Sequence, residues 1–263
     1  SRRRPGRGRP GPRRWPGSIA EIGPGNFLLG TTWKPLNDLF GILPMIVGSL
    51  YVTAGAILIG VPIGILCAVY LARFCPKRLY RVLKPLIDLL AGIPSIVYGF
   101  FGLVVIVPLM QQMTGASGGK NILTASLMLG IMILPTIISV SESAIRAVPQ
   151  SYYEGALALG ATHERSVFFA VLPAAKSGIL AGVILGIGRA IGEATAVKMV
   201  AGNQPIMPAS LLSGVRTLTS NIVVEMGYSE GLHREALIAT AVVLFVFILL
   251  INVSFAAIKK KEG

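Results

Sequence analysis

The sequence predicts an all-α membrane protein, a polytopic helical bundle. Only 13% of its 263 residues are charged, and the mean hydropathy is +0.72. Soluble domains average about 25% charged residues. Five apolar stretches reach the roughly 20 residues that a helix needs to cross the hydrocarbon core. Helices are expected rather than barrel strands, because a helix satisfies its own backbone groups in lipid. The composition argues against a disordered chain and an ordinary soluble enzyme.

Four of the five predicted spans carry no charge: 45–72, 89–113, 122–140 and 236–258. Prolines 62, 94, 108 and 135 lie inside these spans or near their ends, which a helical bundle tolerates because neighbouring groups satisfy the freed carbonyls. Cys67 and Cys75 lie in or beside one span, so we expect neither a disulfide framework nor a metal site.

Basic residues set the predicted orientation. They gather between the first two spans (73–84), between the third and fourth (142–176), and after the last one, so these segments are expected in the cytoplasm. The net charge of +13 does not indicate nucleic-acid binding, because the basic residues border apolar runs and are not interleaved with aromatic residues.

The Arg/Pro/Gly-rich segment 1–26 conflicts with this orientation, because five spans would place it outside. Three interpretations remain open. In the first, the segment is a disordered basic tail that binds lipid headgroups or nucleic acid. In the second, a further first helix is missing upstream. In the third, the start of the sequence is non-native. We favour the last two together.

The segment 142–176 predicts a helical hairpin on the cytoplasmic face. Pro149 breaks the preceding helix. Ser151 is expected to cap a first helix, which ends near Gly160. Thr162 is expected to cap a second helix, which stops at Pro173. One interpretation is a surface hairpin that only completes a connection.

The spacing within this hairpin supports a second interpretation, because it resembles the EAA loop of ABC importer permeases. The pattern is carried by Glu154, Gly155, Ala156, Gly160, Ala170, Leu172 and Pro173, with Gly155 and Ala170 departing from it. The resemblance implies a coupling helix, formed around Glu154, Gly155, Ala156, Gly160, Leu172 and Pro173, that inserts into a groove of a separate ATPase subunit.

The fourth predicted span in chain order, 177–200, is the one that carries charges. Glycines 178, 182 and 186 form a small-residue stripe suited to close helix packing. On a continuous helix Arg189 and Glu193 would lie on the same stripe and face protein. They form either an intrahelical ion pair or an oxyanion contact, in which Glu193 holds the Arg189 guanidinium when the substrate is absent.

Residues 188–203 (GRAIGEATAVKMVAGN) resemble PstC-type permeases of phosphate ABC importers, as do 27–35, 40–50 and 89–103. The resemblance runs over 27–260 and implies a permease domain with six membrane helices, of which five are visible. It also implies that Arg189 and Glu193 contact phosphate on its way through the membrane.

The same resemblance implies partners in a bacterial or archaeal plasma membrane. These are a second, PstA-like permease, PstB-like ATPase subunits and a PstS-like extracytoplasmic phosphate-binding protein that meets the outer loops, including 201–234. No phosphate-cradling loop is present, so ATP is expected to be used by the ATPase and no cofactor or metal to be bound here.

Two alternatives remain. A permease for another oxyanion, sulfate or molybdate, would share the coupling loop. An intramembrane serine hydrolase would use Ser117 of the G-x-S-G at 115–118, with His163 or His233 as its base.

Overall fold

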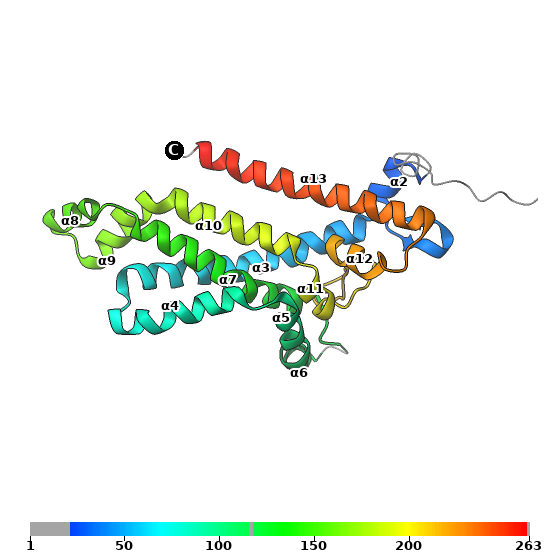
Figure 1. The fold of residues 1–263 in the computed structure, drawn as a ribbon, viewed down its shortest axis with the longest axis horizontal. Helices are drawn as coiled ribbons and strands as arrows, with labels where there is room; N and C mark the ends of the chain where they lie inside the picture. The colour runs from blue at the N-terminus through cyan, green and yellow to red at the C-terminus, as the bar shows by residue number, and fades with distance from the viewer. Residues whose placement is uncertain (1–21, 116–117, 262–263) are drawn as a thin grey trace, which may run out of the picture.

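The computed structural model describes residues 22–115 and 118–261, and within these ranges it is an elongated helical bundle (Figure 1). Five helices there are long and apolar enough to cross a membrane. The expected fold class is therefore confirmed. The basic segment up to residue 21 and the serine proposed as a nucleophile, Ser117, lie outside the described residues.

The elements follow one another as α2 (Pro24–Leu29), β1 (Trp33–Lys34), η1 (Pro35–Asn37), β2 (Leu39–Phe40), α3 (Leu43–Val69), η2 (Tyr70–Phe74), α4 (Lys77–Gly92), α5 (Ser95–Phe101), η3 (Gly102–Ile106), α6 (Val107–Thr114), α7 (Ile122–Arg146), α8 (Gln150–Ala158), α9 (His163–Ser166), η4 (Val167–Val171), α10 (Leu172–Gly192), α11 (Thr195–Val200), α12 (Leu218–Glu225) and α13 (Gly231–Lys261). The segments η2, η3 and η4 are π-helical turns, and η1 is a 3-10 turn.

Helix α7 lies at the centre and packs against α3 and α10. Small residues bring these helices close. A methyl group added at Gly60 of α3 would lie 2.9 Å from the carbonyl oxygen of Gly130, and one at Gly182 of α10 would lie 2.9 Å from Ser141 Oγ. The glycine stripe of the charged span therefore faces α7, as expected for small-residue helix packing.

The second predicted span, 89–113, is found but begins too early: the membrane-length helix there runs from Ser95 to Thr114. Helix α4 begins at Lys77, inside the segment expected to be a basic loop, and ends at Gly92. Ile93 is extended, with φ −67° and ψ 128°. The reason is Pro94, which disfavours helical geometry at the residue before it. The chain then continues as α5, η3 and α6.

The fourth span is also shifted from the predicted 177–200. It begins at His163 and ends at Gly192, so the second hairpin helix and the membrane helix form one unit. Pro173 does not stop it, because the proline lies in the first turn of α10, directly after the π-helical turn η4. Pro62 and Pro135 lie inside helices, as expected.

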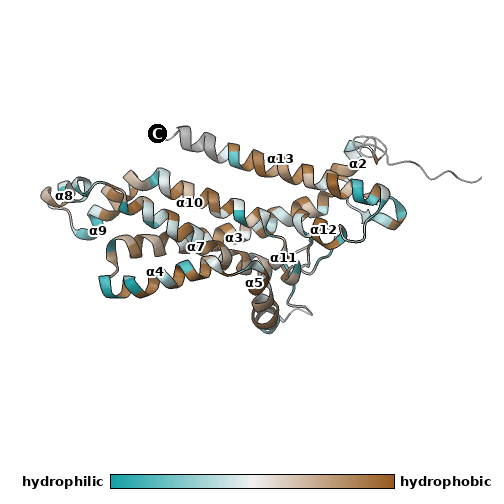
Figure 2. Cartoon of the chain, viewed as in Figure 1, coloured by the Kyte–Doolittle hydropathy of each residue, from teal (hydrophilic) through white to brown (hydrophobic). Residues whose placement is uncertain are grey.

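The bundle has two distinct ends. The inner end, which the basic residues predict to be cytoplasmic, carries α8, α9, the start of α4 and the end of α13 (Figure 1). The outer end carries α2, α12 and the β1–β2 hairpin, in which Trp33 pairs with Phe40. Hydrophilic residues gather at both ends and hydrophobic ones along the helices between them (Figure 2).

Candidate functional site

Glu193 lies at a break between two helices and not on a helix. It follows the last residue of α10 with φ −73° and ψ 120°, and α11 begins two residues later. Its Oε1 accepts a hydrogen bond from the Ala196 N–H at 2.9 Å, which caps α11. Its main-chain carbonyl accepts from the Thr219 hydroxyl of α12 at 3.1 Å. The expectation of a continuous charged helix is therefore wrong.

Arg189 lies half-buried in the last turn of α10 and faces α7. Its Nη1 is 3.3 Å from the Thr136 hydroxyl. Over the described part of the chain Arg189 forms no ion pair with Glu193, because the helix ends between them and the Glu193 carboxylate turns to α11. Of the five N–H donors of a guanidinium, one is used within the described residues. The others can bind an oxyanion.

A second helix break lies beside the first. Helix α4 ends before Pro94 and α5 packs against α11. The packing is close: a methyl group at Gly99 would lie 2.9 Å from the Ala196 Cα. The Tyr98 hydroxyl donates to the Leu90 carbonyl at 2.7 Å, across the break. Broken helices are tolerated at membrane depth where they are buried in protein or line a path for a polar substrate.

The inner end carries the predicted hairpin. Helix α8 ends at Ala158, and Gly160 just after it has φ +85°. The Ala161 N–H donates to the Ala156 carbonyl at 3.1 Å, as in a Schellman turn. Thr162 Oγ1 accepts from the Arg165 N–H, so this predicted cap is confirmed. The predicted cap at Ser151 is wrong: α8 begins at Gln150 without a side-chain cap.

The residues expected to contact an ATPase subunit lie where another protein can reach them. Glu154 and Gly155 are exposed and Ala156 is half-buried, and Leu159 at the tip is 91% exposed. Methyl groups added at Gly155 or Gly160 would meet no atom within 4 Å. Packing within the described chain therefore does not require a small residue at either position. Leu172 and Pro173 lie at the junction with α10, away from the tip.

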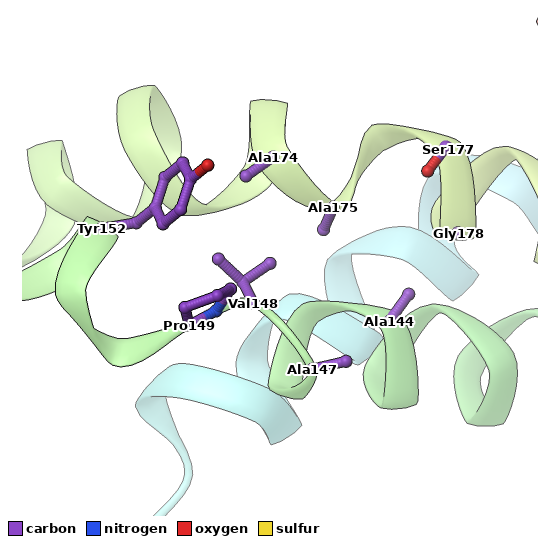
Figure 3. A pocket seen from close by; sticks show the side chains of 9 residues that line it. All are labelled: Ala144, Ala147, Val148, Pro149, Tyr152, Ala174, Ala175, Ser177 and Gly178. Carbon is purple, nitrogen blue, oxygen red and sulfur yellow. The ribbon is translucent and has the colours of Figure 1, made fainter. Parts of the chain in front are cut away.

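Contacts within the hairpin and with η2 position it. The Tyr153 hydroxyl is 2.8 Å from His163 Nδ1, and the His163 ring meets the Phe74 ring edge-on with centroids 4.8 Å apart. Beneath the hairpin base a cavity of about 330 Å³ lies between the first turns of α10 and the end of α7 (Figure 3). It is lined by Ala144, Ala147, Val148, Pro149, Tyr152, Ala174, Ala175, Ser177 and Gly178. These mostly small side chains leave room for the hairpin base to shift.

Two buried carboxylates, Glu142 and Glu225, were not predicted from the sequence. Glu142 of α7 accepts from the Tyr80 hydroxyl and Arg146 Nε, each at 2.7 Å, and its Oε2 is 3.2 Å from Lys84 Nζ. This network joins α4 to α7. The signal in the sequence is the charged face of 77–88, which is expected to find a partner once it lies against the bundle.

At the outer end Glu225 has the corresponding role. Its carboxylate pairs with Arg216 and accepts from Trp33 Nε1 at 2.8 Å, and His233 Nε2 is also 2.8 Å away. These partners come from β1, from α13 and from the loop before α12. Burial raises the pKa of the neighbouring Tyr228 phenol, and the charge of Glu225 adds to that rise. No local pattern pointed to this network.

The bundle, its two helix breaks and its inner hairpin define a transport permease domain. Solved structures share the fold: the inward-facing MetNI methionine ABC transporter matches with a TM-score of 0.69 at 21% identity, over 88% of this chain and 100% of that one. A bacterial ABC transporter for the polysaccharide alginate matches with a TM-score of 0.62 at 14% identity, over 83% of this chain and 79% of that one.

The chain belongs to the family described as "Binding-protein-dependent transport system inner membrane component", which matches residues 60–262. It is 40% identical to the probable ABC transporter permease protein YqgH of Bacillus subtilis, over 88% of this chain and 77% of that protein. It is 34% identical to the phosphate transport system permease protein PstC of Pasteurella multocida, over 90% of this chain and 82% of that protein. The predicted family is confirmed, and the chain is a multi-pass component of an inner-membrane transport system.

Proposed function

We propose that this chain is the permease subunit of an ATP-driven importer of inorganic phosphate. The relatives named phosphate permeases support the substrate, since they align over 86% to 90% of the chain. The observation that carries the role of the site is Arg189, which lies in the last turn of α10 beside two helix breaks. Among the residues that the structure describes, only one of its N–H donors has an acceptor. A planar, permanently charged guanidinium suits a tetrahedral oxyanion.

The proposal includes an assembly with partner subunits. A second permease of similar fold completes the pathway, and a phosphate-binding protein docks at the outer end. ATPase subunits dock on the exposed hairpin around Glu154 and Leu159. ATP is used by those subunits and the permease performs no chemistry on phosphate. Movement of the hairpin reaches α10 directly, because α9, η4 and α10 are one continuous helix.

The test is uptake of labelled phosphate into vesicles that contain the assembled transporter. Arg189→Gln is expected to lower the uptake rate by about 10- to 100-fold, because a charged hydrogen-bond donor to an oxyanion contributes about 1.5–3 kcal/mol. Lys198→Gln is the matched control, since Lys198 is an exposed cation on the adjacent α11 and is expected to be dispensable.

Unchanged uptake with Arg189→Gln at normal assembly would remove Arg189 from the pathway. Sulfate and molybdate are added in separate arms. Stronger inhibition of labelled-phosphate uptake by either anion than by the same concentration of unlabelled phosphate would favour the alternative substrate class.

A further inference from the structure

A basic cavity lies at the inner end, away from the helix breaks. Its volume is about 360 Å³, and four cations line it together with Tyr80. Arg73 comes from η2, Lys77 and Arg81 come from α4, and Arg146 ends α7. The Arg146 guanidinium lies over the Tyr80 ring, 4.4 Å from its centroid, which holds one cation at the wall.

The carboxylates near this cavity are already engaged. Glu142 binds Arg146 and Lys84, and Asp88 lies 3.2 Å from Lys84. The charges of these four residues cancel. Three cations of the wall remain without an acidic partner in the part of the chain that the structure describes. They are Arg73, Lys77 and Arg81.

Arg73 adds a second indication of an anion. One of its terminal nitrogens, Nη2, donates to the Ile145 carbonyl at 3.0 Å, while its Nε is buried and has no hydrogen-bond partner among the described residues. A buried donor without a partner is costly, about 1–3 kcal/mol. An anion in the cavity would supply acceptor oxygens and offset the repulsion among the like charges.

The surroundings indicate which anion. Lys77 and Arg81 lie on one face of α4, while Leu79, Val82 and Leu86 on its other side are exposed large hydrophobic residues. Exposed apolar side chains on a membrane bundle face acyl chains. Helix α4 therefore presents its apolar face to lipid and its basic face to the cavity, at the end of the bundle where headgroups lie. Basic pockets between helices on this side suit anionic headgroups.

We propose that this cavity binds the phosphate group of an anionic phospholipid and thereby ties together η2, α4 and the end of α7. The ligand chemistry is a phosphate oxyanion held by arginine and lysine donors. A free phosphate ion presents the same oxygens. The apolar face of the same helix favours the lipid, because acyl chains can cover that face, whereas a free ion gains nothing from it. This site is separate from Arg189 and does not depend on which substrate the permease carries.

The experiment is native mass spectrometry of the full chain in detergent, titrated with phosphatidylglycerol or, separately, with phosphatidylcholine. The double variant Lys77→Gln/Arg81→Gln removes two exposed wall cations. Its matched control is Arg78→Gln, which removes an exposed cation from the same turn of α4 that does not line the cavity. Thermal unfolding of each variant checks that the fold is retained.

The unsubstituted chain is expected to retain one phosphatidylglycerol molecule in preference to phosphatidylcholine. The double variant is expected to bind it at least about tenfold more weakly, because each basic residue near an anionic surface contributes about fivefold. Arg78→Gln should bind it as the unsubstituted chain does. Equal losses of phosphatidylglycerol binding in both variants would show that only the general surface charge matters, and would overturn the proposal. Displacement by millimolar inorganic phosphate would overturn the lipid assignment and identify a free-phosphate site.

Discussion

Glu142 and Asp88 share one partner, Lys84, yet their surroundings differ. The Glu142 side chain is 2% exposed and also binds Tyr80 and Arg146, whereas the Asp88 side chain is 54% exposed. Buried charges depend on their partners, because removing one partner leaves the other uncompensated. Exposed ion pairs are screened by solvent and contribute little.

These two residues give a matched pair for a stability measurement. Glu142→Gln is expected to lower the free energy of unfolding by about 2–4 kcal/mol, because it leaves Lys84 and Arg146 without their shared carboxylate. Asp88→Asn is expected to change it by less than about 1 kcal/mol. Thermal unfolding of the purified chain in detergent compares them. Equal effects would show that Glu142 does not hold α4 to α7.

Glu193 is a second residue whose role the structure changes. Its carboxylate caps α11 through the Ala196 N–H. Glu193→Gln keeps an acceptor oxygen, so stability is expected to stay unchanged, whereas Glu193→Ala is expected to cost about 1 kcal/mol. Thermal unfolding separates the two variants. If Glu193→Gln destabilises as much as Glu193→Ala, capping is not the role. Loss of phosphate uptake in a stable Gln variant would show that the charge itself is needed.

At the scale of the element, three prolines share a local arrangement. The π-helical turns η2, η3 and η4 each end two residues before a proline: Pro76, Pro108 and Pro173. In each turn the residue just before the proline donates its N–H to the carbonyl five residues earlier, as Leu172 does to Val167. A proline ring crowds the carbonyl four residues before it, and the wider π-turn relieves that crowding.

The turn at Pro173 joins the hairpin to the membrane helix, so it is the one to test. Pro173→Ala restores an N–H that can bond four residues back, which favours closing η4 into a regular helix and rotating the hairpin relative to α10. We expect ATP-driven uptake to fall at least about tenfold with no loss of thermal stability. Pro62→Ala is the control, because Pro62 lies in regular helix within α3. Full uptake by Pro173→Ala would contradict a role of this turn in coupling.

At the scale of the whole molecule, each end of the bundle has its own buried carboxylate network. Glu142 lies in the network at the inner end and Glu225 in the one at the outer end. Each network joins elements far apart in the chain: Tyr80 lies 62 residues from Glu142, and Trp33 lies 192 residues from Glu225. The second hairpin helix, α9, and Arg189, which we propose contacts the substrate, lie on a single long helix. A displacement of the hairpin by a bound ATPase would therefore reach Arg189 through that helix.

The hairpin tip provides the test of this arrangement. Leu159 is 91% exposed at the inner end, and Leu36 is 100% exposed at the outer end. Leu159→Ser is expected to weaken copurification of the ATPase subunits about tenfold or more, since burying a leucine contributes about 1.5–3 kcal/mol. Leu36→Ser should leave it unchanged. Equal recovery of ATPase with both variants would place the docking surface elsewhere.

The sequence alone determined the membrane bundle, the inner hairpin and the family. Apolar runs determine spans because lipid is a uniform apolar solvent. The cap at Thr162 and the helix end at Gly160 are local, since each depends on residues within one turn of itself. Such features can be derived without knowing what packs against them.

Only the tertiary structure decided where the charged residues find their partners. The sequence placed Arg189 and Glu193 on one helix, but the break at Gly192 turns Glu193 toward α11 and α12 and leaves Arg189 facing Thr136 of α7. Glu142 and Glu225 likewise depend on neighbours brought together by packing. The physical reason is that a buried charge is stabilised by whatever surrounds it in space, and helical periodicity describes only the residues along one helix.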